Sequence, residues 1–428
     1  MNRRIFVKSG ALALVTMGLS PSFLRRSVFA AGLPRAQKGK TLICIFQRGA
    51  ADALNVVVPH GERAYYSMRP AIAIPAPTRN TPGAAIDLDG FFGLHPSLSP
   101  FKPLWDRGLL TAVHAVGSPS STRSHFDAQD YMESGTPDNK GTADGWLNRY
   151  LAAKGTCAEC QLTPFRAVAM TPQTPRILEG ASPTIAMNSL DEFTLRTSGD
   201  AAAEIEALYM TGSTDARRSV TVGGSSDVVH SAGGDMFEAI KVLRAANPQK
   251  YQPQNGAQYP NTAYGNHLRQ IAQLIKSDVG LEIAFADIGG WDTHVNQGAA
   301  TGQLAGRLDE FSKGVAALVT DLGDRMRDVA ILTMSEFGRT ARQNGNGGTD
   351  HGHASSMFVI GGEVQGHKVH GKWPGLEQEQ LNEGRDLALT TDFRSVFSEV
   401  VGKHLGATAF DRIFPGFAVD KGKWVGVL

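Results

Sequence analysis

The chain has 428 residues, of which 42% are hydrophobic and 19% charged, and this composition excludes a disordered or collagen-like protein. Its formal net charge of +1 misleads, because residues 1–30 hold five Lys and Arg and no acid, so the remainder carries 37 basic against 41 acidic residues. Without a polybasic stripe in that remainder, we expect no nucleic acid as a partner.

Residues 1–30 are predicted to be a twin-arginine export signal. Residues 2–8 pair Arg3 with Arg4 and continue with an aromatic residue and a lysine, and residues 28–30 offer small residues to a signal peptidase. The alternative is a basic amphipathic helix. The apolar stretch 11–19 is too short for a membrane span. We therefore expect export by the twin-arginine machinery to the periplasm or beyond, with no stable membrane span after processing.

The three cysteines fall into two groups. Cys44 lies in an apolar strand pattern, where it is expected to be a small buried side chain. Cys157 and Cys160 are compatible with a loop disulfide, a redox pair or half of a zinc site, and the disulfide is favoured because no second cysteine pair exists.

The first two predicted strands both end in polar turns. Residues 41–46 form an apolar run that leads to Asp52, which is either a metal ligand or a turn carboxylate. Residues 109–116 form the next buried strand, followed by a hydroxyl-rich turn and a helix over 126–133 that stops at Gly135. Such a turn at a helix N-terminus can present a nucleophilic hydroxyl, or it can simply cap the helix. The competing hydroxyls are those of Ser120, Ser121, Thr122 and Ser124.

Helices and strands alternate through the rest of the chain. The patterns predict helices at 97–107, 146–154, 262–277, 302–327 and 391–405, strands at 165–170 and 184–187, and helical ends to the stretch 200–244. A Gly/Ser-rich segment at 212–234 is expected to be an insertion. The expected fold is a three-layer α/β sandwich with a mostly parallel central sheet, forming one domain over residues 31–428.

Carboxylates and imidazoles gather at the ends of two further strands. The strand 281–287 runs into Gly-Gly-Trp-Asp-Thr-His, which places Asp292 and His294 two residues apart and on one side of an extended segment. The stretch 329–362 is predicted to hold two buried strands joined by a polar loop with four candidate ligands. These are Glu336, Asp350, His351 and His353. Such side chains are ligands for one or two divalent ions, and the pattern does not distinguish zinc, manganese, calcium and magnesium.

Five motifs together resemble an uncharacterised, twin-arginine-exported bacterial family of the alkaline phosphatase/sulfatase superfamily. They are RGAADALN, RSHFDAQDYMESG, GGWDTH, SEFGRT and TDHGH, spread over essentially the whole chain after residue 30. The resemblance implies an alkaline phosphatase/sulfatase-like fold with two divalent metals at the carboxyl ends of the strands. It implies Asp52 as the first-strand ligand and Ser124 as the nucleophile, with Arg123 and His125 beside it in the catalytic set. Arg123 or Arg339 would bind the anionic substrate.

The sequence departs from the superfamily pattern at two places. Asp292 and His294 are separated by one residue where the superfamily has three. Phe337 follows Glu336 where relatives place a ligand histidine, so an imidazole is missing unless His353 or His125 replaces it. A rival alignment takes Asp350 and His351 as the Asp-His pair and seeks the final histidine elsewhere, for example His370.

The resemblance implies an exported, metal-dependent hydrolase or transferase that acts on phosphate or sulfate esters through a serine nucleophile. The alternative is a non-catalytic relative that binds metal and acts as an exported assembly factor or surface component, which the phenylalanine at a ligand position favours. A nucleophile-elbow hydrolase and a nucleotide-binding protein are disfavoured, because Gly-x-Ser-x-Gly and Walker motifs are both missing from the sequence.

Overall fold

The structure, a computed structural model, describes residues 39–78, 81–154, 163–190 and 251–428. The predicted export signal, both cysteines of the Cys157–Cys160 pair, the stretch 200–244 and the insertion at 212–234 lie outside the described residues.

The central strand is β1 (Thr41–Arg48), which pairs in parallel with β8 (Ile283–Gly289) on one side and β9 (Val329–Met334) on the other. Its side chains alternate between two hydrophobic cores, as the period of a strand requires. Leu42, Cys44 and Phe46 enter one core, and Ile43 and Ile45 enter the other. All five are fully buried, which confirms the expectation for Cys44 and explains why this strand reads as a continuous apolar run.

The main sheet of the described residues has nine strands in the order β11-β5-β10-β9-β1-β8-β6-β7, with β12 paired to β5. The remaining strands are β5 (Leu110–Gly117), β6 (Ala167–Ala169), β7 (Ile185–Ala186), β10 (Ser355–Gly361), β11 (Val369–His370) and β12 (Thr391–Asp392). A second, small sheet joins β2 (Val57–Val58), β4 (Gly93–Leu94) and β3 (Ile86–Asp87) beside the short helices α2 (Ala53–Val56) and α3 (Arg63–Met68).

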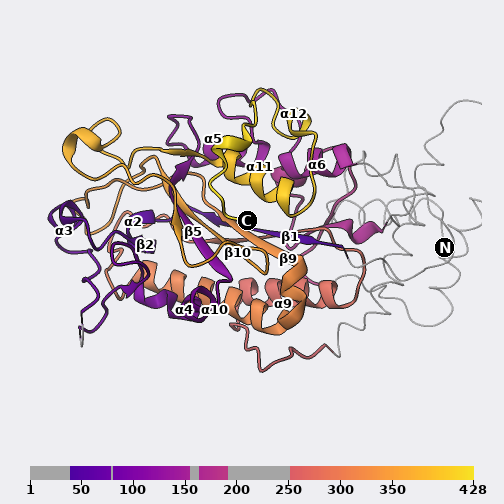
Figure 1. Ribbon diagram of the computed structural model, residues 1–428, viewed down its shortest axis with the longest axis horizontal. Coiled ribbons are helices and arrows are strands. Elements are labelled where there is room, and N and C mark those ends of the chain that lie inside the picture. Colours follow the sequence, from indigo (N-terminus) through magenta and orange to yellow (C-terminus); the bar gives the residue numbers. More distant parts are fainter. Residues whose placement is uncertain (1–38, 79–80, 155–162, 191–250) are drawn as a thin grey trace, which may run out of the picture.

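Helices cover both faces of the main sheet, so the molecule is a mixed α/β structure with a mostly parallel sheet between two helical layers (Figure 1). One face carries α4 (Lys102–Asp106), α9 (Ala263–Lys276) and α10 (Gln303–Leu322). The other carries α5 (His125–Ser134), α6 (Trp146–Lys154), α11 (Phe393–Lys403) and α12 (Phe410–Ile413).

Strand β10 is the exception in this sheet, because it runs antiparallel to both of its neighbours, β5 and β9. It therefore begins at the edge where β9 ends, and the whole connection 335–354 stays at that edge. The parallel strands β1, β8 and β9 end there too, and β5 points the same way. This arrangement gathers the polar turns of four strands at one edge of the sheet.

Most predicted elements occur close to their expected bounds. The helix expected at 126–133 is α5, and Gly135 ends it in the left-handed region with φ of 69°, which glycine adopts without strain. The helix expected at 302–327 ends earlier, at Leu322, because Gly323 also has positive φ and a short 3-10 turn follows. The helix expected at 97–107 divides into a 3-10 helix at Pro96–Phe101 and then α4.

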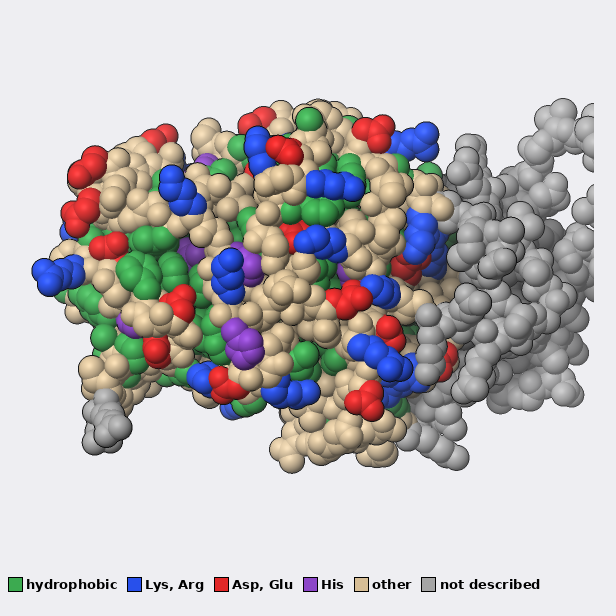
Figure 2. All heavy atoms as spheres, viewed as in Figure 1, with side chains coloured by type: hydrophobic (Ala, Val, Ile, Leu, Met, Phe, Trp, Pro, Cys, Tyr) green, Lys and Arg blue, Asp and Glu red, His purple; other side chains and the backbone are tan. Residues whose placement is uncertain are grey.

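Basic and acidic side chains are interspersed over the face of the molecule shown in Figure 2. Among the described residues, every helix is too short or too polar to cross a bilayer.

A buried carboxylate on α10 fastens the segment that follows residue 250. Asp321 is fully buried, and it accepts hydrogen bonds from the hydroxyls of Tyr251 and Tyr259 at 2.6 and 2.8 Å and from the backbone N–H of Gln254 at 2.7 Å. The ammonium group of Lys276 on α9 forms an ion pair with the same carboxylate. Burial alone raises the pKa of Asp321, but these donors outweigh it and hold the pKa below its usual value.

Replacing Asp321 with Asn should lower the free energy of unfolding by about 2–4 kcal/mol, because it leaves Lys276 without its buried partner. The matched control is Asp309→Asn on the same helix, which breaks an exposed pair with Lys313 and should cost less than about 0.5 kcal/mol. Urea unfolding of both variants measures the difference. Equal losses would contradict the structural role given to Asp321.

Candidate metal centre

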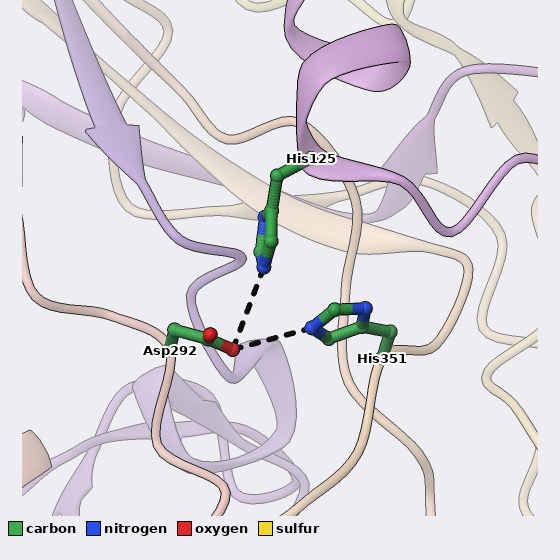
Figure 3. Close-up of side chains that lie close together, drawn as sticks. All are labelled: His125, Asp292 and His351. Carbon is green, nitrogen blue, oxygen red and sulfur yellow. Dashed lines mark hydrogen bonds and ion pairs between the residues drawn. The ribbon is translucent and has the colours of Figure 1, made fainter.

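Three side chains from separate parts of the chain converge at the gathered edge of the sheet. His125 is the first residue of α5, Asp292 follows β8, and His351 lies in the connection between β9 and β10. One ligand atom from each lies within 4.8 Å of the others. Figure 3 shows both imidazoles directed at the Asp292 carboxylate.

A fourth side chain, His294, joins this cluster through its Nε2 atom. That nitrogen lies 3.0 Å from Asp292 Oδ1 and 2.9 Å from His351 Nε2. Asp292 Oδ1 also lies 3.3 Å from His351 Nε2 and 3.5 Å from His125 Nε2. We call His125, Asp292, His294 and His351 the His/Asp cluster. The extended segment after β8 does place Asp292 and His294 on one side, as the sequence pattern predicted.

The partners of the three imidazoles determine which nitrogen carries the proton in each neutral ring. His125 Nδ1 donates to Glu336 at 2.8 Å, His294 Nδ1 to Asp350 at 3.0 Å, and His351 Nδ1 to the carbonyl of Arg123 at 2.8 Å. Carboxylates and carbonyls only accept, so the Nδ1 atoms hold the protons, and in the neutral rings the Nε2 atoms carry lone pairs. That of His294 also accepts from Arg339 at a long 3.5 Å.

These Nε2 atoms face one another, which makes the cluster a fitting donor set for a cation. The Nε2 atoms of His294 and His351 are 2.9 Å apart, and His125 Nε2 is buried without a hydrogen-bond partner among the described residues. Ligand atoms around a tetrahedral ion with bonds of about 2.0–2.1 Å lie about 3.3 Å apart. The separations given above between the nitrogen and oxygen atoms of the cluster, 2.9–3.5 Å, bracket that value.

Glu336, expected as a ligand, lies outside the His/Asp cluster and orients His125 instead. Its fully buried carboxylate also accepts from the backbone N–H of Gly49 at 2.8 Å and from Gln129 at 2.9 Å on the same Oε1 atom. Burial would raise the pKa of Glu336, but the bonds from His125 and Gln129 lower it, so the carboxylate is ionised. A carboxylate behind a histidine in this way is typical of metal sites. The carboxylate of Asp350 accepts from the Nδ1 atom of His294 and orients that ring in the same way.

Phe337 packs beneath two of the imidazoles. Its ring stacks on that of His125 with centroids 5.0 Å apart and contacts that of His351 at 5.1 Å. Phe337, which stands where the resemblance led us to expect a ligand histidine, therefore supports the cluster by contact, and His125 contributes an imidazole beside it. The side chain of His353 is not part of the cluster. His370 lies elsewhere, where its Nδ1 donates to the carbonyl of Val425.

Arg339 sets the charge on the other side of Asp292. Its buried guanidinium donates to Asp292 Oδ1 at 2.5 Å and to backbone carbonyls of the loops after β1, after β8 and before β10. Burial raises the pKa of Asp292, but Arg339 and the neighbouring imidazoles outweigh it and hold the pKa below its usual range. Asp292 is therefore a carboxylate at neutral pH.

Asp52, the expected first-strand ligand, belongs to a separate buried network. Its Oδ2 atom accepts from Arg69 at 2.6 Å and from Gln297 at 2.7 Å. The amide oxygen of Gln297 in turn accepts from the hydroxyls of Thr293 at 2.8 Å and Thr349 at 2.9 Å. These threonines directly precede His294 and Asp350, so the network fixes the two loops that carry the cluster.

The hydroxyl of Ser124 and the guanidinium of Arg123 lie at the start of α5. Ser124 is exposed and caps the helix, accepting from the backbone N–H of Asp127 at a long 3.5 Å. Arg123 is held by Glu383 and Asp386, each at 2.8 Å. The expected substrate-binding arginines, Arg123 and Arg339, are thus both engaged by carboxylates of the protein.

The fold and the cluster define a class: an α/β protein with a histidine–carboxylate cluster at the carboxyl edge of its sheet. A scan against protein-family models matches residues 39–414 to "Protein of unknown function (DUF1501)", and the chain belongs to this family. A search of the curated proteins found no match.

Sequence reasoning missed the residues that hold the cluster in place. Arg69 and Gln297 carry no motif, and their partner Asp52 lies 17 residues before the first and 245 before the second. Arg339 lay inside a recognised motif, SEFGRT, but was expected to bind substrate.

Replacing Gln297 with Leu should weaken zinc binding about 10–100-fold, because both ligand loops lose their shared anchor. The control is Gln270→Leu, which removes another buried amide, bonded to Leu190 and Ser189, and should leave zinc affinity unchanged. Calorimetric zinc titration of both variants gives the comparison. An unaltered affinity in Gln297→Leu would show that the network does not position the ligands.

Proposed function

We propose that this protein is a divalent-metal-dependent hydrolase or transferase that acts on phosphate or sulfate esters. The proposal rests on the Nε2 atoms of His294 and His351, which face each other at 2.9 Å beside the ionised carboxylate of Asp292. The Nδ1 atoms of both rings are already hydrogen-bonded elsewhere. The side chains of Asp292 and His294 are 46% and 38% exposed, so a substrate could reach the centre from solvent.

His125, Asp292, His294 and His351 would hold the ion. A divalent ion there would lower the pKa of a coordinated hydroxyl and neutralise charge on the ester oxygens. The resemblance implies two ions, and a second ion would have to share the carboxylate of Asp292. The guanidinium of Arg339 already donates to that carboxylate and supplies a fixed positive charge there, so we favour a single ion. The family resemblance to the alkaline phosphatase/sulfatase superfamily and to twin-arginine-exported proteins supports the same reaction class in an exported protein.

Ser124 is the proposed attacking hydroxyl. It is exposed, it directly precedes His125, and the one hydrogen bond that its hydroxyl makes within the described residues is a long and weak cap bond of 3.5 Å. It also stands at the N-terminus of α5, where backbone N–H groups favour an anionic oxygen.

Two exposed apolar side chains lie next to the cluster in sequence. Phe126 is 89% exposed and follows His125, and Val295 is 49% exposed and follows His294; they are the large hydrophobic residues exposed in the described part of the chain. Exposed apolar surface beside a polar centre favours a substrate with an apolar group. Aryl esters are therefore the first substrates to test.

A specific observation favours the second candidate, a non-catalytic metal-binding protein. Arg123 and Arg339 are both paired with carboxylates, so neither guanidinium is available to bind the anionic group of an ester. In this reading the ion would be structural or would recruit a partner, and the exposed Phe126 and Val295 would contact that partner.

The metal-loaded protein should hydrolyse an aryl phosphate or an aryl sulfate, and Ser124→Ala should reduce turnover by at least about 10³-fold with unchanged metal content. The matched control is Ser121→Ala, an exposed hydroxyl in the same turn, which should retain activity. Spectrophotometric release of the phenol and metal analysis measure both quantities.

Two outcomes would overturn parts of the proposal. Full turnover by Ser124→Ala would remove the serine from its role while leaving the hydrolase in place. Absence of turnover on both ester classes by the metal-loaded protein would exclude the proposed activity on these esters and favour the non-catalytic candidate.

A further inference from the structure

A cavity of about 750 Å³ lies at the β5 edge of the sheet, away from every residue of the His/Asp cluster. Two short strands complete this edge: β11 pairs with Ala112 and Val113, and β12 pairs with Val116 and Gly117. The cavity lies where β11, β12, the first turn of α11 and the C-terminal segment come together.

The lining of this cavity carries an excess of positive charge. Lys368, Lys372 and Lys423 all line it, and none of the three makes an ion pair or side-chain hydrogen bond with the described residues. Two acids also line it. Asp392 is held by the Arg394 guanidinium at 2.7 and 3.0 Å, and Asp420 accepts from the backbone N–H of Gly422 at 2.9 Å.

Two hydroxyl-bearing residues, Thr391 and Ser395, line the same cavity. Thr391 and Ser395 are 7% and 8% exposed, and neither hydroxyl forms a hydrogen bond within the described residues. Both flank the N-terminus of α11, a helix of 11 residues whose dipole favours anions at this end. Because neither hydroxyl is used within the described residues, both are available to donate to a ligand with acceptor atoms in the cavity.

The rest of the lining is suited to an organic group. Val369, Phe417 and Val425 supply apolar surface. The volume lies within the range of about 300–1,000 Å³ that is usual for sites of drug-sized ligands, and it is far larger than a single inorganic anion needs.

We propose that this cavity is a second ligand site, which binds an organic molecule bearing a phosphate or sulfate group. The three ammonium groups neutralise the oxyanion, the hydroxyls of Thr391 and Ser395 donate to its oxygens, and the apolar residues contact the organic part. This site is independent of the metal centre, so either assignment can fail without the other.

The test uses phenylphosphonate, an anion of this class that esterases do not hydrolyse, in a His294→Ala background that disables the His/Asp cluster. Calorimetric titration should detect binding in this background. Replacing Lys368, Lys372 and Lys423 together with Gln should weaken that binding on the order of a hundredfold, because the charge-assisted contacts are lost.

The matched control is Lys421→Gln, which removes a neighbouring lysine that packs over Phe410 and Trp424 outside the cavity lining. It should leave affinity unchanged. The double variant Thr391→Val, Ser395→Ala tests the hydroxyls without altering charge and should weaken binding about tenfold. The proposal would be overturned if the triple-lysine variant bound phenylphosphonate as tightly as the background does. It would also be overturned if Lys421→Gln weakened binding as much as the triple-lysine replacement.

Discussion

The buried guanidinium of Arg339 is the interaction on which the candidate centre depends. It donates to the carbonyls of Gly49 and Ala50 after β1, of Trp291 after β8 and of Thr349 before β10, and so joins three loops that are far apart in sequence. A planar group with five donors can satisfy so many acceptors at once, which lysine cannot. Because the same guanidinium also holds Asp292, the loops and the charge of the cluster are fixed together.

The direction of β10 explains why the loops meet at all. Apolar runs of the right length predicted the strands, and the rule that parallel strands end at one edge predicted a shared site there. Asp292, His294 and His351 were identified because their signals are local. Which residues pair with one another was not predicted, because Glu336 meets His125 across 211 positions and Asp52 meets Gln297 across 245, and such pairings depend on the completed fold.

The same long-range contacts distinguish the residues that would bind an ion from the residues that orient those ligands. Glu336, Asp350 and Asp52 all read as ligands in the sequence, since a carboxylate at a strand end suits either role. In the structure, Glu336 and Asp350 bond the Nδ1 atoms of two histidines, and Asp52 pairs with Arg69. The His/Asp cluster is therefore richer in imidazole than the set of ligands predicted from the sequence, and such a donor set would suit zinc or another borderline metal better than calcium or magnesium.

The most direct test of the central claim is a calorimetric titration of the metal-stripped, folded protein with zinc, run beside His294→Ala. We expect one tight zinc site per chain in the unaltered protein and the loss of that site in the variant, because His294 contributes one of the Nε2 atoms that would bind the ion. Folded protein that binds no ion, or that binds equally well without His294, would contradict this claim.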